Sequence, residues 1–332
     1  MKSFKWFALS VLAAGLSIPA YAAQSNIKTL HSGTQHEAFF GVSFEGNLGY
    51  AVGAGGSIYA SADKGQSWAR QETPSQLSLF GVALKNNRAI AVGQFGLILT
   101  KQGDQPWQPA DSGTTERLFS VGLNSSGVAV AVGSFGTLLR SSDFGRSWEK
   151  VAVKWEGNFE DPSGRLGSFF EPSLYGVQVN EDGRVLACGE LLLIITSEDG
   201  GQTWDFRNAG GSTDAGVSPT LSGITLRSDN VGYAVGQEGT IYKTVDAGVS
   251  WQALPPTTNA NLLGVGTQSN GLVIITGMRQ MRMSFDDGSK WYSVKGSDIS
   301  SGWYSGVAFM PGSTAPVVVG NRSRMLQIDF ER

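Results

Sequence analysis

One short phrase returns along most of this chain, each time after two apolar strands joined by a Val-Gly turn. The phrase is Ser-x-Asp-x-Gly-x-Ser/Thr-Trp, and we call it the Asp turn. Clean copies span residues 61–68, 141–148 and 197–204, copies at 244–251 and 284–291 each vary at one position, and residues 100–107 form a worn copy. A repeat of about 40 to 50 residues with several strands per unit is typical of a β-propeller.

The number of units follows from the glycine that ends the second strand of each repeat. Seven such glycines occur, at Gly53, Gly93, Gly133, Gly189, Gly236, Gly277 and Gly320. Their spacing places insertions in the third-to-fourth and fourth-to-fifth connections. A Gly-Val pair opens most repeats, as at 41–42, and glycine suits an innermost strand where neighbouring strands crowd the axis. The chain is therefore predicted to be all-β, a seven-bladed β-propeller of four-stranded antiparallel blades.

The last blade needs a strand from elsewhere in the chain. No Asp turn or tryptophan strand follows Met325 and Leu326 in the seventh repeat, whereas residues 27–31 resemble an unpaired fourth strand. We expect this N-terminal strand to complete the last blade, because closure removes the free sheet edges at the seam.

The first 22 residues are typical of a cleavable signal peptide. Lys2 and Lys5 precede an apolar run over residues 7–16, and residues 20–22 read Ala-Tyr-Ala, the small-x-small pattern of a cleavage site. The run is shorter than the roughly 20 residues of a membrane span. We expect residues 23–332 to form a single propeller domain, in the periplasm rather than outside the cell, without direct insertion into the membrane.

Charge and composition exclude several classes of partner and cofactor. Loss of residues 1–22 removes two lysines and no acids, which leaves a net charge of −5 and no electrostatic drive toward nucleic acid. His31 and His36 have no ligand-like spacing, so neither a metal nor a cofactor is predicted. Cys188 occupies a slot that holds Val in most other repeats, and we expect it to be buried and inert.

The recurring residues of the Asp turns are predicted to be structural rather than catalytic, because a catalytic residue is needed once and this Asp recurs in five copies. An Asp in a strand-to-strand turn accepts backbone N–H groups, the glycine two residues later takes a positive φ, and the tryptophan packs between blades. The residues assigned this role are Asp63, Trp68, Asp143, Trp148, Asp199, Trp204, Asp246, Trp251, Asp286 and Trp291.

The Asp turn resembles the Asp-box, or bacterial neuraminidase repeat, of sialidase-like propellers. Residues 49–58 and 232–241 add the pattern Gly-Tyr-Ala-Val-Gly-x-x-Gly-x-Ile before it. With both features, the chain is most similar to the photosystem II stability and assembly factor family. This resemblance implies a non-catalytic lumenal or periplasmic scaffold for a membrane-protein client. In a bacterium without a photosystem, it implies a client such as an inner-membrane transporter.

A glycan-binding module or a glycosidase is the alternative function, with carbohydrate as the partner, because sialidases share the repeat. The Phe/Tyr-Arg-Ile-Pro start of sialidases is absent from this chain. Two carboxylates would suffice for glycoside hydrolysis. Acids that stand outside the repeat pattern and would supply them are Asp161, Glu171, Glu190 and Glu238.

The longest insertion, residues 155–172, lies in the connection from the third blade to the fourth. It carries Trp155, Phe159, Phe169 and Phe170 among glycine, proline and acidic residues. Loops on a rigid scaffold are where binding usually occurs. Two alternatives stay open here: the aromatic side chains contact a partner, or they fold over the mouth of the ring as a plug.

The turns between second and third strands are chemically uneven. In a propeller they share a face with the blade-to-blade connections, opposite the Asp turns. Two residues after each turn glycine stand Gly55, Phe95, Phe135, Leu191, Glu238, Arg279 and Arg322, so one arc is apolar and the next is charged. Arg282 and Arg324 also replace core-type residues in third strands, which indicates either a function or a local ion pair.

We therefore predict that a partner binds this face, because arginine and exposed aromatic residues are the usual anchors of interfaces. The assembly-factor resemblance implies an arginine-rich patch, and this cluster matches it by residue type. A solvated basic edge paired with Glu238 or Glu190 is the alternative. The predicted partner-binding residues are Arg279, Arg282, Arg322, Arg324, Phe95, Phe135, Glu238, Trp155, Phe159, Phe169 and Phe170.

Overall fold

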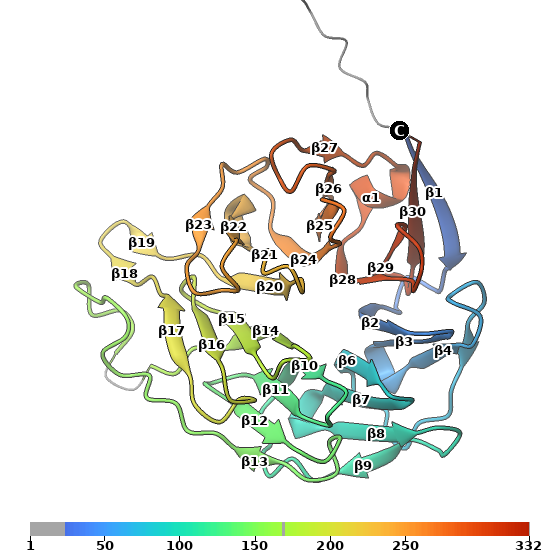
Figure 1. The fold of residues 1–332 in the computed structure, drawn as a ribbon, viewed down its shortest axis with the longest axis horizontal. Helices are drawn as coiled ribbons and strands as arrows, with labels where there is room; N and C mark the ends of the chain where they lie inside the picture. The colour runs from blue at the N-terminus through green and yellow to red at the C-terminus, as the bar shows by residue number, and fades with distance from the viewer. Residues whose placement is uncertain (1–23, 168–169, 332) are drawn as a thin grey trace, which may run out of the picture.

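The computed structural model describes residues 24–167 and 170–331, which form seven four-stranded antiparallel sheets arranged as a ring (Figure 1). The seven-bladed β-propeller expected from the repeats is confirmed. The expected signal peptide, residues 1–22, lies outside the described residues.

Blades one to four each take four consecutive strands, from the axis outward. Blade one comprises β2 (Phe39–Glu45), β3 (Leu48–Gly53), β4 (Ile58–Ser61) and β5 (Ala69–Arg70). Blade two comprises β6 (Leu79–Lys85), β7 (Arg88–Gly93), β8 (Ile98–Gln102) and β9 (Gln108–Ala110). Blade three comprises β10 (Leu118–Leu123), β11 (Ala129–Gly133), β12 (Leu138–Ser141) and β13 (Glu149–Lys150), and blade four β14 (Leu174–Val179), β15 (Val185–Gly189), β16 (Ile194–Ser197) and β17 (Asp205–Asn208).

The remaining blades follow the same order, except at the seam. Blade five comprises β20 (Leu221–Leu226), β21 (Gly232–Gly236), β22 (Ile241–Thr244) and β23 (Gln252–Ala253), and blade six β24 (Leu262–Thr267), β25 (Val273–Gly277), β26 (Met281–Ser284) and β27 (Tyr292–Ser293). Blade seven comprises β28 (Tyr304–Phe309), β29 (Pro316–Gly320), β30 (Met325–Glu331) and β1 (Gln24–His31).

The connections hold the other short elements. The fourth-to-fifth connection forms a hairpin of β18 (Ser212–Thr213) and β19 (Gly216–Val217), which projects from the ring in Figure 1. The sixth-to-seventh connection contains the one-turn helix α1 (Ser297–Ser301). Three turns between second and third strands are 3-10 segments, η1 (Ala54–Gly56), η2 (Gln94–Gly96) and η3 (Gln237–Gly239).

The seam is closed by the N-terminal strand, as predicted. β1 pairs antiparallel with β30 from Gln24 opposite Glu331 to His31 opposite Met325, so the strand begins three residues before the predicted Ile27. His31 packs edge-on against Tyr59 of blade one, with ring centroids 4.7 Å apart, and its Nδ1 lies 2.8 Å from Ser323 O. The strand therefore ties blade seven to blade one as well as completing its own sheet.

Glycines of the innermost strands allow the blades to meet at the axis. A Cβ added to Gly41 would lie 3.3 Å from Gly81 Cα of the next blade, and one on Gly306 would lie 3.2 Å from Gly41 Cα. The expectation that side chains would crowd this position is confirmed.

The apolar core lies between neighbouring blades. Val130 and Val132 of blade three, for example, share a cluster with Val177 and Val185 of blade four. Cys188 is fully buried, as expected, among residues of blades four and five, and burial raises the pKa of its thiol to about 12. A thiol held in this state is not nucleophilic near neutral pH.

The Asp turns share one repeated hydrogen-bond pattern. In the first copy, Ser67 donates its N–H to Asp63 Oδ1 at 2.9 Å and its hydroxyl to Asp63 Oδ2 at 2.6 Å. Trp68 donates its indole N–H to Gly65 O at 3.1 Å. The hydrogen bond from the Ser67 hydroxyl is the main cause that lowers the pKa of Asp63 to about 2. The fourth strand of this blade begins at Ala69, one residue after the tryptophan.

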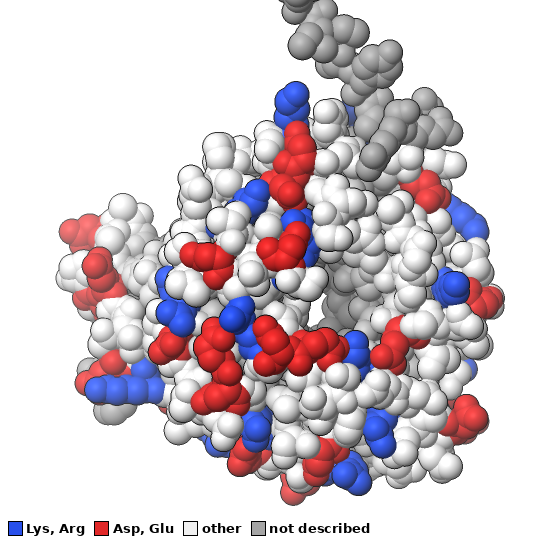
Figure 2. Space-filling model, viewed as in Figure 1, with Lys and Arg blue, Asp and Glu red and all other residues white. Residues whose placement is uncertain are grey.

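The ring surrounds an opening along its axis. Figure 2 shows this opening at the centre of the face in view, where Asp and Glu side chains gather beside it with Lys and Arg among them. Within residues 24–167 and 170–331, no helix has both the length and the apolar character that a bilayer span requires.

Candidate partner-binding site

The two faces of the ring carry different turns, in the arrangement expected from the sequence. Lys64 of the first Asp turn donates its N–H to Asn47 O at 2.9 Å, which places Asp turns beside the turns between first and second strands. On the opposite side, Gln94 donates its N–H to Ser78 O at 3.0 Å, which joins a turn between second and third strands to a blade-to-blade connection. We call this opposite side the connection face.

In each turn of the connection face, the residue two positions after the turn glycine lies in the left-handed region of backbone space. A residue with a side chain pays about 1–2 kcal/mol to adopt this conformation. Residues strained in this way persist only where the surrounding structure imposes the conformation, and they occur preferentially at active sites and ligand-binding sites. Values of φ lie between +50° and +62° at all seven slots, Gly55, Phe95, Phe135, Leu191, Glu238, Arg279 and Arg322.

Exposure separates these slots into two groups. Phe95 and Phe135, on the neighbouring blades two and three, are each 65% exposed. Glu238, Arg279 and Arg322 are exposed on blades five, six and seven. The connection face thus presents an apolar pair on one arc and charged side chains on another.

Leu191 of blade four departs from this pattern. Its side chain is buried, and Gly210 of the fourth-to-fifth connection donates its N–H to Leu191 O at 2.6 Å. The insertion before blade five therefore covers the slot that would otherwise extend the apolar arc.

Two of the four predicted arginines are held by neighbours. Arg324 is only 14% exposed and forms an ion pair with Asp298 of α1, with Nη1 to Oδ1 at 2.8 Å. Arg282 donates to Thr257 O at 3.0 Å and to the Ser293 hydroxyl. A local ion pair is thus present at Arg324.

Arg279 and Arg322 stand apart from that pair. Within the described part of the chain, neither of their side chains makes a hydrogen bond or an ion pair. In particular, neither pairs with Glu238 or Glu190, the partners named in the alternative. Their guanidinium groups are therefore available to an incoming anionic group.

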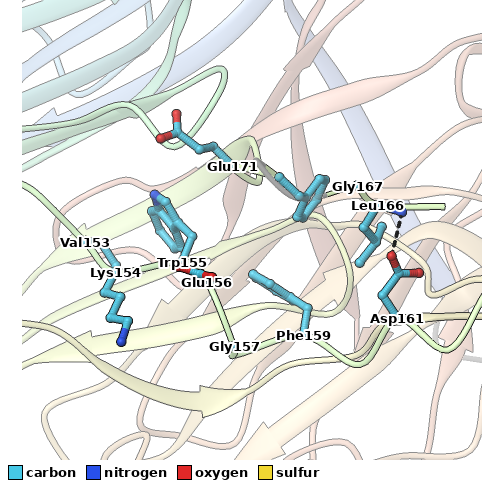
Figure 3. A pocket seen from close by; sticks show the side chains of 11 residues that line it. Val153, Lys154, Trp155, Glu156, Gly157, Phe159, Asp161, Leu166, Gly167 and Glu171 are labelled. Carbon is cyan, nitrogen blue, oxygen red and sulfur yellow. Dashed lines mark hydrogen bonds between the residues drawn. The ribbon is translucent and has the colours of Figure 1, made fainter. Parts of the chain in front are cut away.

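The 155–172 insertion surrounds a hollow of about 580 Å³ beside the ring (Figure 3). Trp155 is 6% exposed and packs edge-on against Phe206 of blade four, with ring centroids 5.8 Å apart. Phe159 packs against Phe170, with centroids 5.5 Å apart. Phe169 lies outside the described residues. None of the loop's described residues lines the axial cavity, so they do not form the plug that was one alternative.

Two of the four acids considered for glycoside hydrolysis have local structural partners. Both carboxylate oxygens of Asp161 accept backbone N–H groups, from Arg165 and Leu166, each at 3.0 Å. Figure 3 shows Asp161 and Glu171 at opposite ends of the hollow. Glu190 accepts the Ser173 N–H at 2.9 Å. Asp161 and Glu190 therefore stabilise their own loops.

The structure also reveals an aromatic arc that the sequence reasoning missed. It runs around the mouth of the ring from Trp303 through Phe40, Phe80 and Phe119 to Tyr175, with neighbouring ring centroids 4.9 to 5.9 Å apart. Burial and the nearby Glu190 carboxylate raise the pKa of Tyr175, which keeps its hydroxyl neutral. The sequence carries a signal for this arc. In the first four repeats an aromatic residue stands directly before the Gly-Val pair, or before Ser-Val in the third repeat.

Comparison with known proteins supports the resemblance seen in the repeats. No family model matches the chain. It is 24% identical over 224 residues to the photosystem II assembly lipoprotein Ycf48 of Synechococcus sp. (strain CC9902), covering 64% of this chain and 61% of that protein. It is 28% identical over 245 residues to the chloroplastic photosystem II stability/assembly factor HCF136 of Arabidopsis thaliana, covering 68% and 58%. The matched segment thus spans about 60% of these relatives, and the resemblance to this group of proteins is confirmed.

Solved structures confirm the fold. YCF48 bound to a D1 peptide superposes with a TM-score of 0.67 at 18% identity, covering 91% of this chain and 96% of that one. An enzyme shares the architecture too: the GH74 xyloglucanase of Xanthomonas campestris matches with a TM-score of 0.65 at 16% identity, covering 90% of this chain and 53% of that one. The fold alone therefore does not separate a binding protein from an enzyme.

Proposed function

We propose that this protein is a non-catalytic, exported scaffold that binds an exposed segment of a membrane-protein client through its connection face. The observation that carries the proposal is the set of exposed side chains on left-handed turns. Arg279 and Arg322 have no partner within the described residues, and Phe95 and Phe135 hold apolar surface in water. Arginine and aromatic residues of this kind supply most of the binding energy in protein interfaces.

The relatives support a client of this class. Ycf48 and HCF136 are named as photosystem II assembly or stability factors, and YCF48 has been solved with a D1 peptide bound. For this chain the client is a membrane protein or a subunit of a membrane complex. In a cell without a photosystem, we propose an inner-membrane transporter complex, and we place the protein in the periplasm.

The direct experiment is capture of the client from detergent-solubilised membranes of the native cell, with a crosslinker and mass spectrometry. Arg279→Glu combined with Arg322→Glu is expected to abolish capture while leaving the melting temperature unchanged. Lys64→Glu with Lys290→Glu is the matched control, because it reverses two exposed charges in Asp turns on the opposite face. Unchanged capture by the first variant would defeat the assignment of the connection face.

The alternative function, a glycan-binding module or a glycosidase, predicts that the protein binds or hydrolyses a carbohydrate. It requires retention of the wild-type protein on a glycan column, reduced by Phe159→Ala, or saturable turnover of a glycan. Retention on the column together with no crosslinked membrane protein would favour this alternative over the scaffold.

A further inference from the structure

Every innermost strand contains a β-bulge at the same slot. In β2, for instance, Phe39 pairs with Gly53 and Gly41 with Val52, which leaves Phe40 outside the ladder. A β-bulge re-aims the side chain of its unpaired residue, and such bulges occur preferentially beside functional sites. The seven bulged residues are Phe40, Phe80, Phe119, Tyr175, Ser222, Leu263 and Ser305.

These residues surround an axial cavity of about 620 Å³ that all seven innermost strands line. Its wall contains no Lys, Arg, Asp or Glu among the described residues. Blades one to four contribute aromatic rings, whereas blades five and seven contribute Ser222 and Ser305. A charged group would lose its hydration here without gaining an opposite charge. The cavity therefore disfavours a charged group, and the aromatic rings of blades one to four offer apolar contact to an uncharged, bulky one.

The aromatic arc meets the charged turns at Trp303. This ring stacks on Phe40, with centroids 5.7 Å apart and planes inclined by 14°. Arg279 donates its N–H to Gly302 O at 2.8 Å, and Asn321, next to Arg322, donates its N–H to Trp303 O at 3.0 Å. Trp303 thus lies between the two turns that carry Arg279 and Arg322. A cationic site that suits an anionic group therefore adjoins the cavity.

We propose that the axial cavity receives a phenylalanine or similarly bulky apolar side chain from an extended client segment, whose neighbouring carboxylate pairs with Arg279 and Arg322. This inference rests on the proposed function and adds the chemistry of the ligand. The aromatic rings in an uncharged wall favour the apolar residue, and charge complementarity with the two arginines favours the acidic one. The recognised element is thus a short acidic-aromatic stretch of a partner protein.

Synthetic peptides test the proposal with the full mature protein. Each probe is a fluorescein-labelled Gly-Ser chain that carries one Glu and one Phe, separated by no glycine, one glycine or two. Partner probes replace the Phe with Gly or the Glu with Gln. Fluorescence anisotropy with wild-type protein is expected to show at least about tenfold tighter binding for one Glu-Phe probe than for either partner probe.

A double-mutant cycle localises the effect. Phe80→Ser with Phe119→Ser converts two slots to the residue that blades five and seven carry there, and is expected to remove the preference for Phe over Gly. Arg279→Ser with Arg322→Ser is expected to remove the preference for Glu over Gln. Val245→Ser, which changes an exposed apolar residue of an Asp turn, is the control and should leave both preferences intact.

Wild-type protein that binds no Glu-Phe probe, or binds its Gly version equally well, would overturn the inference without any variant. If client capture from membranes is nevertheless lost on reversal of Arg279 and Arg322, the proposed function stands and only the cavity assignment falls. If capture is also unaffected by that reversal, both proposals fail.

Discussion

Asn321 and Trp303 exchange two hydrogen bonds. The Asn321 N–H donates to Trp303 O at 3.0 Å, and the Trp303 N–H donates to Asn321 Oδ1 at 3.1 Å. The contact joins the turn of Arg322 to the segment that begins the last blade. It also fixes the stacked ring of Trp303 at the mouth of the cavity, so the arginine turn and the aromatic arc are held as one unit.

Asn321→Ala is expected to lower the free energy of unfolding by about 1–3 kcal/mol, because it leaves the half-buried Trp303 N–H without its acceptor. Urea denaturation measures the loss. Asn261→Ala is the control, since the Asn261 side chain accepts only a longer, exposed bond of 3.3 Å from Glu238 N–H. Equal losses in the two variants would contradict a special role for the Asn321 contact.

Removal of residues 24–31 is expected to destabilise the whole ring by more than about 3 kcal/mol. The deletion strips β30 of its partner and removes the buried contacts of Ile27 and Leu30, each of which contributes about 1–2 kcal/mol through burial. Thermal unfolding followed by circular dichroism reports the change. A synthetic peptide of residues 23–35, added in excess, should restore part of the lost stability. An unchanged melting temperature after deletion would refute closure by this strand.

The Asp turns predict how stability depends on pH. The pKa of Asp63 is held near 2 in the folded protein, against about 3.9 in an unfolded chain. The folded state therefore prefers the carboxylate. This contribution is complete above about pH 4 and is lost as pH falls toward 2.

Asp63→Asn is expected to be less stable than the wild type at pH 7 and to show a shallower loss between pH 4 and pH 2. Melting temperatures at pH 7, 4 and 2.5 provide the comparison. The hydrogen bonds that lower the pKa of Asp246 to about 2 predict the same behaviour for Asp246→Asn. A slope identical to that of the wild type in both variants would show that these turns do not set the acid response.

Phe95→Gly and Phe135→Gly are expected to leave the fold intact and to raise the free energy of unfolding by up to about 1 kcal/mol each. Glycine removes the cost of a positive φ, which exceeds its own entropic penalty. Blade one already carries Gly55 at the same slot. Urea denaturation measures stability, and client capture should weaken in the same variants. A loss of stability would show that the two rings make contacts that favour the fold.

The repeated parts of the molecule were predictable because their interactions are local. Asp63 bonds to Ser61 and Ser67, so each Asp turn carries its own partners within a few residues. The same logic repeated along the chain sets the number of blades. Closure was predictable as well, since one blade lacked a strand and residues 27–31 supplied it.

The site was less predictable because its geometry depends on distant partners. Trp155 is buried by Phe206, and Arg324 is neutralised by Asp298, two contacts that no local pattern announces. In the sequence Leu191 continues the apolar arc, but in the structure the fourth-to-fifth connection covers it. The aromatic residues at the bulges lie far apart in the sequence, and their convergence on one cavity appears only when the ring is closed.

Closure by β1 has a consequence for how such a chain acquires its structure. His31 contacts Ser323, 292 residues later, so β1 cannot pair until β30 has been synthesised. Until then the outer edge of β1 and the open edge of blade seven are both free to pair with foreign strands. A pairing this distant in sequence is slow to form, because the chain between the two strands loses conformational entropy before their contacts form. A chain interrupted before blade seven therefore keeps two unpaired sheet edges, one on β1 and one on its last complete blade. Only the complete ring pairs both.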